Sequence, residues 1–136
     1  MTLIVVDASI AVKWLIDEGD QERAIAIGKL GDLIAPDIIS LEVANALWAK
    51  VRAKKISRSH ADDLFATLMH WPMTFASSVR LAERARSLSF ELDAAIYDCL
   101  YWALALEQSA ALATADLAFI AKLRRKRVPA SRIILL

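Results

Sequence analysis

Apolar residues follow two different spacings along this chain, and stretches of the two kinds alternate. Residues 3–6, 111–114 and 132–136 are short runs of apolar, often β-branched residues at successive positions. Such runs are typical of strands that are covered on both faces, as in a parallel sheet. A further short strand is expected within residues 33–38, next to the turn that Pro36 favours.

Between these runs, apolar residues recur every three or four positions, which is the period of an amphipathic helix. The pattern predicts seven helices, over residues 8–16, 20–30, 40–55, 59–71, 79–88, 94–108 and 117–126. Strands that alternate with helices predict an α/β fold. We expect a three-layer α/β/α sandwich around a short parallel sheet, in a single domain over residues 1–136.

Composition favours a compact globule. Hydrophobic residues make up 57% of the 136 residues, and the chain has only three glycines and three prolines. No stretch of 18 residues is free of charge, and the N-terminus lacks the basic segment of a signal peptide, so neither membrane spanning nor secretion is expected. Cys99 is the single cysteine, which excludes an intramolecular disulfide and fits a cytoplasmic protein.

The formal net charge of +1 conceals a blocky distribution of cations. Lysine and arginine gather in residues 50–58, 80–86 and 122–127. Each block alone is explained by a solvated helix face or by the preference of cations for helix C-termini. Three blocks together favour a nucleic-acid partner somewhat more than one block would.

Two acids stand where a strand gives way to a helix. Asp7 directly follows the first run, and Asp116 lies two residues past the run at 111–114. Either could simply cap the helix that follows it. In open α/β sheets, however, ligands bind outside the carboxyl ends of the strands, which is where both acids fall.

Two further acids lie on predicted helices. Asp98 is the only charged residue within 94–106 and is expected a full turn or more inside its helix, so its carboxylate needs a cation or an ion-pair partner. Glu42 lies in the first turn of its helix, where the helix dipole alone would favour it. Asp93 is expected to be the N-cap of the helix that carries Asp98.

Four carboxylates in one cleft would repel one another, by roughly 3 kcal/mol per pair at about 5 Å, and would need a metal ion. Oxygen ligands without histidine or cysteine select Mg²⁺, or Mn²⁺ as a substitute, rather than zinc. Such ions activate water for phosphodiester cleavage. Ser9 and Thr114 are close enough in sequence to contact ligands or substrate, although a hydroxyl at a helix start is as often a local cap.

Four segments in order and spacing, "VVDASIAVKWL", "SLEVANALWAKV", "YDCLYWALA" and "LATADLAF", resemble the motifs of PIN-domain ribonucleases, specifically the VapC toxins of toxin–antitoxin pairs. The resemblance spans residues 5–119. It implies that Asp7, Glu42, Asp98 and Asp116 assemble the metal site, with Ser9 and Thr114 at the family's small polar positions.

The resemblance further implies an Mg²⁺-dependent endoribonuclease that cuts structured RNA, such as transfer or ribosomal RNA. It also implies a small VapB-type antitoxin that lies over the active groove, and a homodimer. On this reading Asp7, Asp98 and Asp116 are the principal metal ligands, and Glu42 is a ligand or orients the attacking water. Candidate contacts to the RNA backbone are Arg52, Lys54, Lys55, Lys122, Arg124 and Arg125.

Other functions fit the sequence less well. A receiver-like signalling domain needs an adjacent acidic pair near the first strand, and a haloacid-dehalogenase-type phosphatase needs an aspartate at the position of Ser9. The remaining alternative is a catalytically silent PIN fold that only binds RNA or a protein partner.

Overall fold

The computed structural model describes residues 2–136 and contains one five-stranded sheet in which every neighbouring pair of strands is parallel. The central strand is β1 (Leu3–Val6). On one side of it lie β2 (Asp32–Pro36) and β3 (Met73–Ala76), and on the other β4 (Ala111–Thr114) and β5 (Ile133–Leu135). The strand order is therefore β3-β2-β1-β4-β5.

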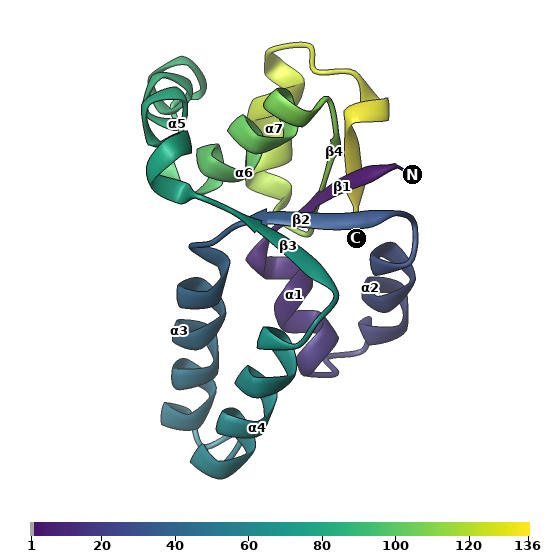
Figure 1. Cartoon of the computed structure of the whole chain (residues 1–136), viewed down its shortest axis with the longest axis vertical. Helices are drawn as coiled ribbons and strands as arrows, with labels where there is room; N and C mark the ends of the chain where they lie inside the picture. Colours follow the sequence, from purple (N-terminus) through teal and green to yellow (C-terminus); the bar gives the residue numbers. More distant parts are fainter. Residues whose placement is uncertain (1) are drawn as a thin grey trace.

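Helices cover both faces of this sheet (Figure 1). The helices of the first half lie together: α1 (Ala8–Leu15), α2 (Gln21–Gly28), α3 (Ile39–Arg52) and α4 (Arg58–Met69). The opposite layer holds α5 (Ser78–Leu92), α6 (Ile96–Gln108) and α7 (Leu117–Arg125), and a short 3-10 turn, Ala130–Arg132, leads into β5. The three-layer sandwich and the parallel sheet expected from the sequence are confirmed.

The order of the strands creates a topological switch point between β1 and β4. From β1 the chain adds β2 and then β3 on one side, then returns past β1 to add β4 and β5 on the other. Parallel crossovers are right-handed, so this reversal also moves the helices from one face of the sheet to the other. At such a switch point the loops after the two central strands diverge and leave room for a ligand.

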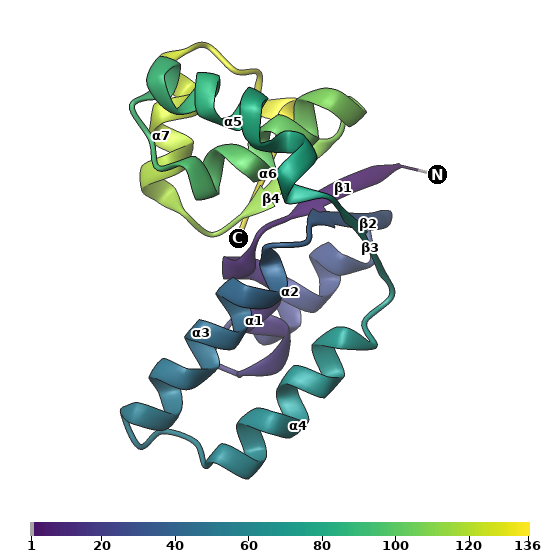
Figure 2. The same cartoon turned by 60° about the vertical axis from the view of Figure 1, so that its left-hand side comes forward.

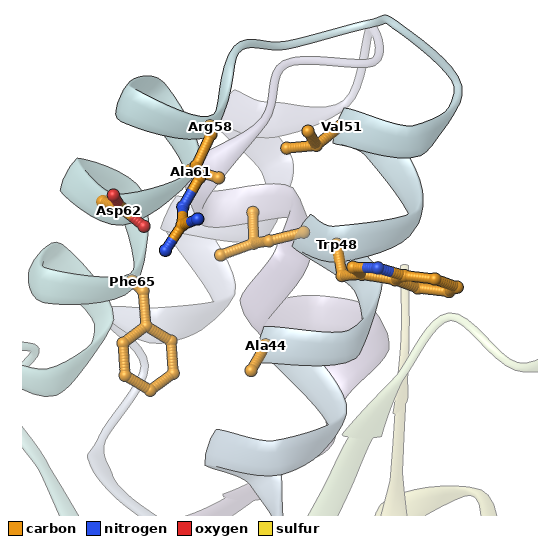
Figure 3. A pocket seen from close by; sticks show the side chains of 8 residues that line it. Ala44, Trp48, Val51, Arg58, Ala61, Asp62 and Phe65 are labelled. Atoms are coloured by element: carbon orange, nitrogen blue, oxygen red, sulfur yellow. The ribbon is translucent and has the colours of Figure 1, made fainter.

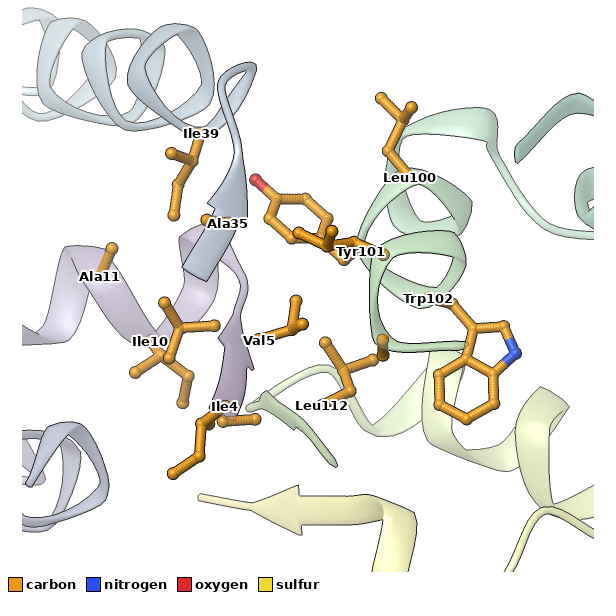
Figure 4. Packing of buried hydrophobic residues seen from close by; sticks show 14 of the residues in the cluster. Ile4, Val5, Ile10, Ala11, Ala35, Ile39, Leu100, Tyr101, Trp102 and Leu112 are labelled. Carbon is orange, nitrogen blue, oxygen red and sulfur yellow. The ribbon is translucent and has the colours of Figure 1, made fainter. Parts of the chain in front are cut away.

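The core packs on both faces of the central strands (Figure 4). Val5 on β1, Ile10 on α1 and Leu104 on α6 are all fully buried and belong to one hydrophobic cluster. From Cys99 to Ala105 every residue of α6 is buried. This degree of burial explains the uninterrupted apolar sequence of that helix and fixes how its first turn is presented.

Helices α3 and α4 form a hairpin that extends away from the sheet (Figure 2). Ser57 caps α4 by accepting a hydrogen bond from the backbone N–H of His60, 3.0 Å away. No helix in the described part of the chain is long and apolar enough to cross a membrane.

Three details differ from the sequence-based expectations. The strand β3 was missed, because Thr74 is exposed and the run is only four residues long at the sheet edge. Asp93 does not cap α6: it ends α5 in the left-handed conformation, with φ 50°, which aspartate tolerates better than most residues. Asp98 lies in the first turn of α6, not a full turn inside it, since the helix begins only at Ile96.

Candidate functional site

Asp7 lies at the carboxyl end of β1 and is 9% exposed. It caps α1, because its Oδ1 accepts a hydrogen bond from the backbone N–H of Ile10 at 3.3 Å. Its two carboxylate oxygens also accept the hydroxyl protons of Ser9 and Thr114. The predicted cap is confirmed, but capping one N–H does not account for so many donors on one buried carboxylate.

The hydroxyls of Ser9 and Thr114 connect the ends of β1 and β4. Each donates its proton to Asp7 and accepts from a backbone N–H of the loop after β4: Ser9 Oγ from Ala115 at 2.9 Å and Thr114 Oγ1 from Asp116 at 3.0 Å. Thr114 is completely buried. Both hydroxyls are therefore engaged inside the protein, and they fix the loop that carries Asp116 against Asp7.

Asp116 caps α7, since its Oδ1 accepts from the backbone N–H of Phe119 at 3.0 Å. This bond uses one carboxylate oxygen. The same side chain acts electrostatically on Asp98, whose pKa it raises. The helix start thus places the charge of Asp116 beside the first turn of α6.

Asp98 interacts electrostatically with each of the other three acids. Burial first, then the charges of Asp116, Asp7 and Glu42 in that order, raise its pKa from 3.8 to about 6, while Lys122 opposes them. Burial likewise raises the pKa of Asp7 to about 6, against the lowering effect of its hydrogen bonds. The settings of Asp98 and Asp7 therefore disfavour the negative charge of these two side chains.

Glu42 lies in the first turn of α3 and is partly buried. Its Oε1 accepts a hydrogen bond of 2.5 Å from the hydroxyl of Tyr101, which is 2% exposed. Burial and the nearby acids raise the pKa of this phenol far above its ordinary value, so that the hydroxyl remains a donor. Sequence reasoning missed Tyr101 as a site residue; the available signal was its position one turn after Asp98 in an otherwise apolar helix.

None of the four acids forms an ion pair with a residue of the described chain, residues 2–136. In residues 2–136 the ion pairs involve other acids, namely Asp20, Glu18, Glu107 and Glu83. In their present positions no three acidic, histidine or cysteine side chains of the described chain lie where they could hold one metal ion. In this structure the carboxylates of Asp7 and Glu42 accept hydrogen bonds from protein hydroxyls.

The candidate RNA-contacting cations lie at varied distances from the acids. Lys122 acts on the site: it donates to the backbone carbonyl of Asp93 and lowers the pKa of Asp98. Arg52 ends α3 ten residues after Glu42, which is about 15 Å along the helix axis. Lys54 and Lys55 follow it and are exposed, and Arg124 and Arg125 occupy the last turn of α7, at the end opposite Asp116.

Comparison with known proteins identifies the fold and its family. Residues 4–125 match the family model of the PIN domain. The chain belongs to the PIN-domain family. Ribonuclease VapC9 of Mycobacterium tuberculosis is 31% identical to this PIN domain over 115 residues, which are 85% of this chain and 87% of the relative. The chain is therefore a PIN domain of the VapC ribonuclease family, as its motifs predicted.

Two solved structures support the fold. The Mycobacterium tuberculosis toxin VapC20, described as cleaving the sarcin-ricin loop, superposes with a TM-score of 0.68 at 14% identity, covering 87% of this chain and 93% of that one. VapBC2 of Rickettsia felis, bound to a DNA fragment of its promoter, gives a TM-score of 0.59 at 14% identity, covering 99% of this chain and 98% of that one.

VapC ribonucleases with PIN domains generally depend on a divalent metal.

Proposed function

We propose that this PIN domain is an Mg²⁺-dependent endoribonuclease toxin that cuts structured RNA at the carboxyl ends of β1 and β4. The observation that carries the proposal is the electrostatic coupling of Asp98 to Asp116, Asp7 and Glu42 without an ion pair to any of them. Uncompensated carboxylates at a ligand-binding edge are costly unless a cation joins them. Transfer and ribosomal RNA are the substrate classes we expect.

The donor set fits a hard divalent ion. Asp7, Asp98 and Asp116 would hold Mg²⁺, or Mn²⁺ in its place, through carboxylate oxygens, which are the ligands that these ions prefer. When bound, the ion supplies a polarised water and charge stabilisation for phosphodiester cleavage.

The chain's own residues divide the remaining work. The hydroxyls of Ser9 and Thr114 hold the Asp7 carboxylate in one orientation. Glu42 would orient the attacking water. Lys122, which acts on Asp98, is the cation placed to attract the RNA backbone near the acids. Arg52, Lys54, Lys55, Arg124 and Arg125 would contribute more distant, salt-sensitive contacts to the same backbone.

The partner we propose is a small VapB-type antitoxin. An apolar hollow of about 590 Å³ opens between α3 and α4 (Figure 3). Leu47, Val51 and Phe65 line it, and the exposed Trp48 stands at its border. An apolar antitoxin segment would fill this hollow close to the helix that carries Glu42.

A homodimer acting in the cytoplasm completes the proposal. A second, smaller hollow of about 360 Å³ adjoins Glu42, where the exposed side chains of Leu41 and Tyr97 lie together. Apolar groups exposed side by side are typical of a surface that another chain covers.

The decisive experiment is RNA cleavage by the purified protein. We expect structured RNA to be cut in millimolar Mg²⁺ and to stay intact in EDTA. Asp98→Asn should abolish cleavage and remain folded, because the amide keeps the shape of the side chain and removes the charge. Asp63→Asn, an exposed acid on α4, is the matched control and should cut like the wild type.

Intact RNA after incubation of the wild type with Mg²⁺ would favour the silent RNA- or partner-binding module instead. Equal cleavage by Asp98→Asn would remove that residue from the mechanism. Sequencing of the RNA ends after induced expression would identify the substrate.

A further inference from the structure

Tyr101 places a polar hydroxyl group in the buried core. The residue lies in the buried stretch of α6, and only 2% of it is exposed. A phenylalanine would fill the same space without a polar atom to satisfy. A buried tyrosine hydroxyl is tolerated when it has a hydrogen-bond partner, so the identity of that partner indicates what the hydroxyl does.

The partner is an acid of the candidate site. The ring points from α6 toward the segment of chain that holds Ile39 (Figure 4), and its hydroxyl donates to Glu42 Oε1 at 2.5 Å. Helices α6 and α3 lie in opposite layers of the sandwich, so this bond joins the two layers at the edge of the sheet. A residue that served only to fill the core would not need to reach a carboxylate across the sheet.

The two carboxylate oxygens of Glu42 differ in their hydrogen bonding. Oε1 accepts from Tyr101, whereas Oε2 receives no hydrogen bond from residues 2–136. A glutamate side chain loses conformational entropy when it is held in one rotamer. The hydrogen bond from a neutral donor to one oxygen offsets part of this entropic cost before a metal ion binds. The carboxylate is thereby held with one oxygen unused.

We propose that Tyr101 is a positioning residue, which holds Glu42 so that its free oxygen serves the metal ion or the attacking water. The proposal rests on the nuclease function proposed above. Hydrogen-bond partners of metal ligands of this kind commonly change metal affinity or activity by about 10- to 100-fold when they are removed.

The first test measures metal binding directly. Isothermal titration of Mn²⁺ into Tyr101→Phe should show affinity roughly 10-fold weaker than that of the wild type. The matched control is Thr67→Val, which removes a hydroxyl from an exposed position on α4 and should bind Mn²⁺ like the wild type. In a Glu42→Ala background, Tyr101→Phe should have no further effect, because it acts through Glu42.

A second measurement leaves Tyr101 in place. The chain has two tyrosines, so in Tyr97→Phe the only tyrosine is Tyr101. The ring carbon of Tyr101 that bears the hydroxyl is labelled with ¹³C. Its NMR signal should shift when Mg²⁺ is added and when Glu42→Ala is introduced. A signal that moves with neither change would overturn the proposal even if Tyr101→Phe failed to fold.

The outcomes separate the two proposals. Wild-type protein that neither binds Mn²⁺ nor cuts RNA would defeat the nuclease function, and the role of Tyr101 with it. Wild-type protein that does both, with equal Mn²⁺ affinity in Tyr101→Phe and Thr67→Val, would overturn the role of Tyr101 alone. An equal loss of affinity with and without Glu42 would mark the hydroxyl as structural.

Discussion

At the scale of single residues, hydroxyl groups determine how the acids are presented. Thr114 is completely buried, yet it is threonine and not valine, because its hydroxyl serves Asp7 and the backbone of Asp116 together. Tyr101 does the same for Glu42. Hydroxyl groups inside the protein thus hold the carboxylates of Asp7 and Glu42 in place.

Thr114→Val should therefore destabilise the protein although it preserves side-chain shape. The change removes one donor from Asp7 and leaves the N–H of Asp116 without its acceptor, which costs about 1–3 kcal/mol for a buried group. Urea denaturation would measure the loss. Thr74→Val, on the exposed face of the edge strand β3, is the control and should change the free energy of unfolding by less than about 0.5 kcal/mol. Equal stabilities of the two variants would contradict the role of the hydroxyl.

At the scale of elements, the sequence predicted the layers well and the boundaries less well. All seven helices and four of the five strands were expected, because burial on both strand faces and one helix face leaves a clear apolar period. The missed strand β3 has little burial to mark it. The start of α6 was placed too early because Ala94 and Ala95 continue the apolar pattern, although Ala95 is extended and the helix begins at Ile96.

The candidate site, too, could be predicted only in part from the sequence. The four acids could be named from motif and position, since strand ends and helix starts place them. Their partners could not: Tyr101 lies 59 residues from Glu42, and Thr114 lies 107 residues from Asp7. Such pairings depend on the strand order, which no local pattern contains. For the same reason, the sequence could not show that Asp7 and Glu42 are turned toward hydroxyls.

Asp7, at the junction of β1 with α1, should make the free energy of unfolding of the metal-free protein depend on pH. Burial raises the pKa of Asp7 from 3.8 to about 6, so between those values the folded state binds more protons than the unfolded state. The free energy of unfolding should consequently fall as pH rises from about 4 to 6, by about 3 kcal/mol for this group alone.

Urea denaturation in EDTA at several pH values would test this, with Asp7→Asn as the comparison. The difference between wild type and variant isolates Asp7 from exposed acids whose pKa values are lowered, such as Glu18 and Glu107. A difference that does not vary between pH 4 and 6, or that favours the wild type increasingly as pH rises, would contradict the assignment.

At the scale of the whole molecule, four mutually repelling carboxylates should link metal binding to stability. Adding Mg²⁺ at tenfold its dissociation constant at neutral pH should stabilise the fold by about 1.4 kcal/mol, which raises the melting temperature by roughly 4 °C. Sodium chloride at matched ionic strength is the control for screening. A variant with both Asp98→Asn and Asp116→Asn should lose the shift, and an identical shift with either salt would count against a clustered site.

The strand order also governs when the molecule can acquire its activity. Asp7 follows β1 and Asp116 follows β4, so Asp7 is synthesised earlier, and β4 pairs with β1 across more than a hundred residues of intervening chain. A nascent chain thus lacks both the last acid and the threonine that orients the first until that late strand has left the ribosome. If the four acids form the cleavage site proposed above, the chain cannot cut RNA until β4 has been made and has paired with β1.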